Sequence, residues 1–167
     1  MKFQRDFDAI YLEYSDRIYR YLYIHTRNPY LSEDITSEVF LRLWKKWESI
    51  RFDFIQALLF KIARNILIDY WRKKKEKKEF SLEEVIETGL EPRYNEDFIE
   101  NIQKDENIRH INGAIAYLPK NLKDVVILRF IEDLSAKETA LILKISEVNV
   151  RVLQYRALKK LKKFFKK

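Results

Sequence analysis

The sequence predicts an all-α protein of two helical modules joined by a flexible acidic linker, with a helix-turn-helix in the C-terminal module. Only two Gly and three Pro occur in 167 residues, which favours helices. Apolar residues recur at helical spacing in both halves of the chain, whereas the acidic stretch between them lacks sustained periodicity. The predicted modules therefore span residues 1–78 and 107–167, and the predicted linker spans 79–106.

The first predicted helix covers residues 7–27, where an apolar and aromatic stripe has helical spacing. The stripe consists of Phe7, Ile10, Tyr11, Tyr14, Ile18, Tyr21 and Leu22. We expect Asn28-Pro29 to end this helix, because a residue that precedes proline is disfavoured in the helical region.

A second helix is predicted from Ser32, whose hydroxyl can cap it, with Glu33 and Asp34 in its first turn. One side is a broad apolar arc made of Ile35, Val39, Phe40, Leu43, Trp44 and Trp47. The other side brings together Asp34, Ser37, Glu38, Leu41 and Lys45. An acidic face with one outward leucine suits a basic and apolar protein partner, although solvated faces also have this composition.

The third predicted helix follows a break at Arg51-Phe52, and Asp53 with Gln56 resembles a capping box. Its apolar face consists of Ile55, Leu58, Leu59, Ile62, Ile66 and Tyr70. The helix ends in the basic run 72–75, beside Tyr70 and Trp71. Cations stabilise a helix C-terminus, and interleaved aromatic residues can also stack on unpaired bases.

Helical spacing returns at Ile108 in a predicted helix that Gly113 weakens. Pro119 suits the first turn of the next predicted helix, which runs to Asp133.

Residues 134–157 then organise the C-terminal module. Ser135 and Glu138 form a capping box for a short helix, whose apolar positions are predicted to be Ala140, Leu141 and Leu143. Lys144-Ile145 is a tight connection, and Ser146 is a second N-cap. Two short helices joined by so tight a turn, the second of them cationic, are typical of a helix-turn-helix.

The second helix of this motif has two different faces. The face predicted to reach the core consists of Val150, Leu153, Ala157, Leu161 and Phe164. The opposite face carries Val148, Val152, Tyr155, Arg156 and Lys159, flanked by Asn149 and Arg151. In a major groove, apolar groups can touch thymine methyls, Arg and Asn can reach base edges, and Lys can neutralise phosphate. A solvated basic helix is the plainer interpretation of this face.

Charge is segregated along the chain, which carries a net charge of +7. Residues 1–75 contain 15 basic and 10 acidic residues, residues 76–106 contain 4 and 11, and residues 107–167 contain 14 and 5. Basic blocks predict a polyanionic partner, most commonly nucleic acid.

Cysteine is absent, which excludes disulfides, thiolate metal sites and cysteine nucleophiles. Without a signal peptide or a bilayer-spanning apolar run, we expect a cytoplasmic protein that does not insert into membranes.

Four blocks of the chain resemble one family, the small two-domain extracytoplasmic-function (ECF) sigma factors of bacterial RNA polymerase. In the N-terminal module the blocks are EDITSEVFLRLWKKW and LLFKIARNILIDYWRKKK. In the C-terminal module they are LPKNLKDVVILRFIEDLSAKETALILKIS and NVRVLQYRALKKL. All four stand in the family's order on either side of the acidic stretch.

The resemblance implies a role for each of three surfaces. Asp34, Ser37, Glu38 and Leu41 match the patch that docks on the polymerase clamp. Arg64, Asn65, Asp69, Arg72 and Lys73 match the helix beside the minus-ten element, and the loop 47–53 matches one that captures an unstacked base. Ser146, Asn149, Arg151, Val152, Tyr155, Arg156 and Lys159 match the surface that reads the minus-thirty-five element. The implied partners are core RNA polymerase, promoter DNA and an anti-sigma factor, with no cofactor.

The chain also departs from the family pattern. Ser37 stands where Gln is usual, and Leu58 stands where Trp is usual. Lys144 replaces a turn Gly, at a cost of roughly 1 kcal/mol if the backbone there is left-handed. Asn149 and Val152 replace a usual Thr and Ser, which predicts a particular promoter preference.

Three other functions compete with a promoter-opening sigma factor. A helix-turn-helix regulator that does not join polymerase would have the same C-terminal half, but it leaves the N-terminal blocks unexplained. A sigma-like protein could bind polymerase without opening promoters. An enzyme is disfavoured, because the sequence has no Gly-rich phosphate loop, nucleophile motif or converging metal ligands.

Overall fold

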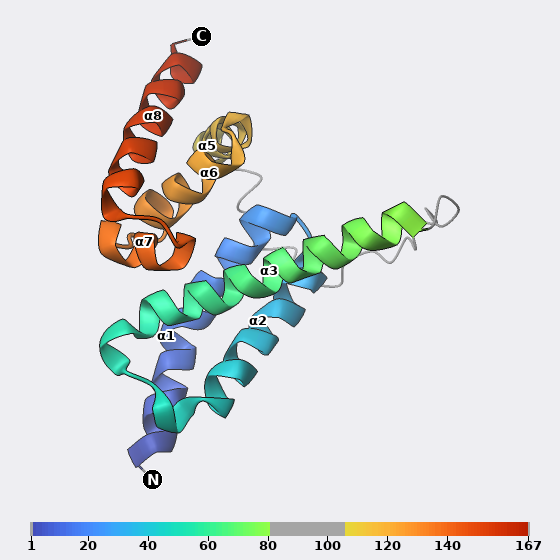
Figure 1. Cartoon of the computed structure of the whole chain (residues 1–167), viewed down its shortest axis with the longest axis vertical. Helices are drawn as coiled ribbons and strands as arrows, with labels where there is room; N and C mark the ends of the chain where they lie inside the picture. The colour runs from blue at the N-terminus through green and yellow to red at the C-terminus, as the bar shows by residue number, and fades with distance from the viewer. Residues whose placement is uncertain (1, 81–105, 167) are drawn as a thin grey trace. The chain divides into compact units, whose positions relative to one another are not determined.

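The computed structural model describes residues 2–80 and 106–166, and every regular element within them is helical (Figure 1). The chain divides into two compact units, Met1–Pro92 and Arg93–Lys167. The predicted all-α fold is therefore confirmed. Most of the predicted linker lies outside the described residues, but α3 continues to Phe80 and α5 begins at Glu106.

None of the helices in these two ranges is long and apolar enough to cross a membrane.

In the N-terminal unit, α1 (Lys2–Thr26), α2 (Pro29–Lys45) and α3 (Ile55–Phe80) all pack against one another (Figure 1). Two 3₁₀ helices, η1 (Trp47–Ser49) and η2 (Phe52–Phe54), connect α2 to α3. The centre of the core consists of the fully buried residues Ile18, Leu22, Val39, Leu43, Leu59, Phe60 and Ala63. Each helix thus contributes one apolar side to a shared core.

The start of α2 differs from the prediction that Ser32 is its cap. Asn28 is the N-cap, because its Oδ1 accepts a hydrogen bond from the amide of Leu31 at 3.1 Å, and Pro29 occupies the first turn. The Ser32 hydroxyl is buried and donates to the Asn28 carbonyl at 2.7 Å. Asn caps helices as well as Ser does, and proline fits the first position because no amide hydrogen is needed there.

The start and the buried side of α3 also differ from the prediction. Asp53 lies within η2, and the Gln56 side chain accepts from the Arg17 guanidinium on α1 at 2.8 Å. The predicted apolar face missed Phe60, Ala63 and Leu67, all of which are buried. Because α3 packs on both α1 and α2, its buried side is wider than the single stripe used for the prediction.

The C-terminal unit contains α5 (Glu106–Tyr117), α6 (Lys120–Val126), α7 (Ala136–Leu143) and α8 (Glu147–Phe165). The helix predicted from Pro119 has Pro119 as its N-cap, and it widens into the π-helix η3 (Ile127–Ile131) before a turn leads to α7. In this unit α8 packs against α5, α6 and α7. The fully buried apolar residues there are Val125, Ile127, Leu128, Leu134, Val150 and Ala157.

Candidate functional site

The helix-turn-helix predicted at residues 134–157 is present. The Ser135 hydroxyl accepts from the Glu138 amide at 3.0 Å, and the Glu138 carboxylate accepts from the Ser135 amide at 2.8 Å. Lys144 ends α7 in the left-handed conformation, with φ 57° and ψ 42°. The Ser146 hydroxyl then accepts from the Asn149 amide at 3.1 Å and caps α8. Both predicted caps and the tight turn are therefore confirmed.

The two faces of α8 are arranged as predicted. Val150 and Ala157 are buried, while Leu153, Leu161 and Phe164 are partly buried. The opposite side is exposed at Val148, Asn149, Arg151, Val152, Tyr155, Arg156 and Lys159.

One prediction for α7 is wrong: Leu141 is 49% exposed, and its neighbour Ile142 is buried instead. The short α7 turns that position outward because Ala136, Thr139, Ala140 and Ile142 form its buried side.

The exposed face of α8 is cationic and has few fixed partners. Arg151 lies 3.6 Å from the Glu147 carboxylate, and both side chains are more than 40% exposed. Such an exposed pair contributes little to stability and can be given up to another anion. Towards its C-terminus α8 adds Lys159, Lys160, Lys162 and Lys163, all exposed. The face therefore combines replaceable cations with apolar and amide groups.

Arg129 holds α8 in place, a role that local patterns in the sequence do not predict. Its side chain donates to the Leu134 carbonyl at 2.6 Å and to the Gln154 side chain at 3.0 Å. Leu134 immediately precedes the cap of α7, and Gln154 belongs to α8. The signal in the sequence was a lone cation in the apolar run VVILRFI, because a half-buried cation requires acceptors.

The α2 residues predicted to share a face do so. Asp34, Ser37 and Leu41 are exposed, and Glu38 is half-buried. The Glu38 carboxylate accepts from the Arg42 guanidinium at 2.8 Å, one turn along the helix. Ile35, Val39 and Leu43 are buried on the opposite side of α2. The result is an exposed, mainly acidic strip with an apolar point at Leu41, which is 47% exposed.

The predicted residues of α3 form a more polar strip. Arg64, Asn65 and Asp69 are half-buried, whereas Arg72 and Lys73 are exposed. Arg72 donates to the Asp69 carboxylate at 3.1 Å. Trp71 is half-buried, and its ring lies 6.2 Å from the ring of His25 on α1. Cations therefore continue along α3 beyond the part of the helix that is packed in the core.

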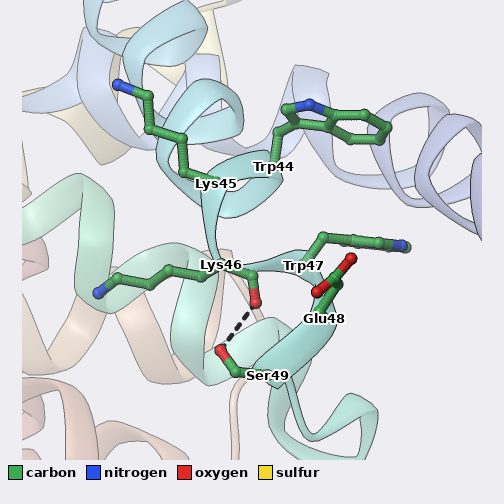
Figure 2. Close-up of a pocket in the computed structure, with 6 residues that line it drawn as sticks. All are labelled: Trp44, Lys45, Lys46, Trp47, Glu48 and Ser49. Carbon is green, nitrogen blue, oxygen red and sulfur yellow. Dashed lines mark hydrogen bonds between the residues drawn. The ribbon is translucent and has the colours of Figure 1, made fainter.

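A pocket of about 880 Å³ opens where α2 ends, and it is lined by residues 44–49. Figure 2 shows the rings of Trp44 and Trp47 directed to one side, and the side chains of Lys45 and Lys46 directed to the other. A hydrogen bond from the Ser49 hydroxyl to the Lys46 carbonyl, 2.9 Å long, closes the turn (Figure 2).

Aromatic contacts support the wall of this pocket. The Phe7 ring lies 4.9 Å from Trp44 and 5.2 Å from Trp47, and Trp47 lies 5.1 Å from Phe52. Trp47 is buried as predicted, but Trp44 is 49% exposed and stands at the edge of the apolar arc. The exposed Trp44 ring offers an aromatic surface on which a base can stack, while Lys45 and Lys46 place positive charge on the other side of the pocket.

Two family descriptions match the two units. Sigma-70 region 2 matches residues 10–77, and Sigma-70 region 4 matches residues 109–161.

Two relatives resemble the chain over nearly all its length. The ECF RNA polymerase sigma factor SigM of Bacillus subtilis is 30% identical over 159 residues, which cover 95% of this chain and 94% of SigM. The ECF RNA polymerase sigma factor BldN of Streptomyces coelicolor is 32% identical over 158 residues, which cover 93% of this chain and 58% of BldN.

Two solved structures share the fold. The sigma factor RpoE in complex with the anti-sigma factor NepR, from Bartonella quintana, has a TM-score of 0.77 and 18% identity, with 97% of this chain and 98% of that chain covered. CnrH in complex with the cytosolic domain of CnrY has a TM-score of 0.69 and 18% identity, with 98% and 89% covered.

Proposed function

Because this chain belongs to the ECF sigma factors of RNA polymerase, we propose that it binds core polymerase, recognises promoter DNA and helps to open the duplex. The observation that carries this proposal is the presence of sigma region 2 and sigma region 4 in one chain, in that order. A helix-turn-helix regulator that does not join polymerase is not favoured, because it has no use for region 2.

In this proposal each unit has its own task. Residues 1–78 bind core polymerase and the minus-ten element, residues 107–167 bind the minus-thirty-five element, and residues 79–106 connect them. Because DNA repels the acidic residues 79–106, the two basic units on either side are proposed to supply the free energy of DNA binding.

The strip on α2 is proposed to dock on polymerase. Asp34, Ser37, Glu38 and Leu41 lie on one exposed side, and Leu41 offers an apolar contact among acidic groups. The Glu38 and Arg42 side chains are each more than 40% exposed, so a basic group on the polymerase can compete for the carboxylate at little cost.

The strip on α3 and the pocket at residues 44–49 are proposed to hold the unpaired strand. Arg64, Asn65, Asp69, Arg72 and Lys73 supply polar and cationic groups along α3. The pocket supplies aromatic walls and two lysines. Opening a duplex requires unstacking, which costs a few kcal/mol per base, and a pocket that accepts one flipped base offsets part of that cost.

The outward face of α8 is proposed to read the major groove of the upstream element. Asn149, Arg151, Val152, Tyr155 and Arg156 are exposed in the first half of the helix, and Lys159 follows one turn later. Ser146, the N-cap of α8, is proposed to contact the DNA phosphate backbone. Residues near the start of a recognition helix reach base edges, and more distal lysines reach phosphates.

The chain is proposed to act in the cytoplasm through binding alone, while the polymerase supplies the catalysis. No cofactor enters this mechanism. An anti-sigma factor is proposed as a further partner, in keeping with the family resemblance and with the complex in which RpoE was solved.

Run-off transcription with core polymerase on a genomic promoter library tests the proposal. We expect discrete transcripts that depend on this chain. Co-purification with core polymerase without transcripts would indicate a sigma-like protein that cannot open promoters. Failure to co-purify would contradict the proposal and would favour a free DNA-binding regulator.

A further inference from the structure

Two valines on the outward face of α8 have no place in the core. Val148 is 67% exposed and Val152 is 40% exposed, one helical turn apart on the same side. The core is filled from the other side of α8, where Val150 and Ala157 are fully buried. Packing of the C-terminal unit therefore does not explain a branched apolar side chain at either position.

Helix formation does not explain these valines either. A β-branched side chain loses rotamer freedom in a helix, so lysine, glutamate or alanine would suit an exposed position better. Of their sequence neighbours, Glu147, Asn149 and Arg151 are polar or charged, and Leu153 packs against the core. The two valines form a narrow apolar strip within a polar face, rather than the edge of a large apolar patch.

The surrounding charges indicate which partner covers this strip. Arg151, Arg156 and Lys159 are exposed near it, and the Arg151 side chain is 63% exposed. A cluster of exposed cationic side chains such as this one favours binding to a polyanion. The apolar group that a DNA duplex presents in its major groove is the 5-methyl group of thymine. The second helix of a helix-turn-helix is the element that enters this groove.

We propose that Val148 and Val152 recognise thymine methyl groups in the upstream promoter element. This inference rests on the proposed function and specifies the base that this part of α8 selects. Valine has no hydrogen-bonding group, so recognition depends on the methyl group alone. Thymine is therefore preferred over both cytosine and uracil at the positions that face these side chains.

The test uses the full chain assembled with core polymerase, together with a promoter duplex that the wild-type holoenzyme selects from a library randomised across the upstream element. Each thymine of that element is replaced in turn by uracil, which lacks only the 5-methyl group. Holoenzyme affinity is expected to fall about fourfold for each methyl group that is contacted. Equal affinity at every position would overturn the proposal, as would a selected element without thymine.

Val148→Ala and Val152→Ala assign the effect to the two side chains. Each variant should lose the response to uracil at one position, while its melting temperature stays the same or rises. Leu158→Ala is the matched control, because Leu158 is 45% exposed on α8 but lies about a quarter of the helix circumference from Val148 and about a third from Val152. It should keep the full response, and a full response in both valine variants would also overturn the proposal.

Transcription from the thymine-containing promoter separates a failure of methyl recognition from a failure of the proposed function. If the wild-type chain transcribes it and is indifferent to uracil, only the methyl recognition is wrong. If it supports no transcription, the proposed function and this inference both fail.

Discussion

The Arg129 guanidinium donates a 3.0 Å hydrogen bond to the side-chain carbonyl of Gln154, and thereby ties the π-helix η3 to α8. The same guanidinium donates to the Leu134 carbonyl at 2.6 Å, just before α7 begins. Hydrogen bonds from a charged donor are stronger than neutral ones. One half-buried side chain therefore fixes the segment before α7 and the middle of α8.

Arg129→Met is expected to lower the free energy of unfolding by about 1–3 kcal/mol, because the Leu134 carbonyl loses its charged donor. Gln154→Leu should cost less, and the double variant should cost less than the sum of the two single variants. Urea denaturation of the four proteins measures this coupling. Arg156→Met, at an exposed position of the same helix, is the control and should change stability little. Additive effects of Arg129→Met and Gln154→Leu would show that their hydrogen bond is not formed in solution.

Gly113→Ala is expected to stabilise the C-terminal unit. Gly113 lies inside α5, and a β-carbon there would stand 3.8 Å from Cζ of Phe164 on α8, which is an ordinary contact distance. Alanine in a helix interior is about 0.8–1 kcal/mol more favourable than glycine. The expected result is a higher denaturation midpoint, with Ala116→Gly on the same helix lowering it by a similar amount. A loss of stability in Gly113→Ala would mean that α5 and α8 pack more closely than the structure indicates.

Lys144→Gly is expected to stabilise the turn of the helix-turn-helix. Lys144 has φ 57° and ψ 42°, where an L-residue costs roughly 1 kcal/mol more than glycine. Glycine loses more conformational entropy on folding, so the net gain should be smaller. Thermal unfolding measures the gain, and Lys160→Gly within α8 should instead destabilise the chain. An unchanged or lower melting temperature in Lys144→Gly would indicate that the lysine side chain makes a compensating contact.

Local signals in the sequence predicted the C-terminal unit better than the N-terminal one. The caps at Ser135 and Ser146 depend on residues three positions apart, so the sequence contains the whole interaction. The cap of α2 was missed because Asn28 and Ser32 are both good capping residues, and the choice depends on the left-handed turn at Arg27. The predicted buried side of α3 was too narrow, because the number of helices that pack against α3 sets the width of that side.

In the candidate surfaces, too, features set by nearby residues were predicted and features set by distant contacts were not. Exposure of Arg151, Val152 and Tyr155 followed from helical periodicity alone. The role of Arg129 did not, because its acceptors lie 5 and 25 residues away along the chain. The pocket at residues 44–49 depends on how Phe7, at the start of the chain, packs against Trp44 and Trp47.

Glu38→Lys is expected to weaken binding to core polymerase while the fold remains intact. The substitution removes the acceptor of Arg42 and places two cations one turn apart on an exposed strip, which costs only a few tenths of a kcal/mol in the helix. Pull-down with core polymerase should show reduced retention and an unchanged melting temperature. Glu13→Lys, an equal charge change at an exposed position of α1, is the control. Wild-type retention of a folded Glu38→Lys protein would remove this strip from the polymerase interface.

Arg151→Ala and Arg156→Ala are expected to change which bases are preferred at one or two positions of the upstream element. Both side chains are exposed on the outward face of α8, and a base-contacting arginine contributes about 1–3 kcal/mol of discrimination. Removal of Arg151 also leaves Glu147 without its neighbour at 3.6 Å, so Glu147→Gln is a useful companion variant that keeps the arginine. Transcription by the reconstituted holoenzyme on promoters randomised across the element measures these preferences.

Lys162→Ala separates base reading from phosphate contact. Lys162 is exposed near the end of α8, more than one turn beyond Arg156, where a cation meets phosphate rather than base edges. Its removal should lower affinity equally for all promoters and reduce the salt dependence by about one counterion. Repeating the promoter selection at two salt concentrations distinguishes the two behaviours. If both arginine variants kept the wild-type preference and lost only overall affinity, α8 would position the chain without reading bases, and sequence choice would fall to α3 and the loop before it.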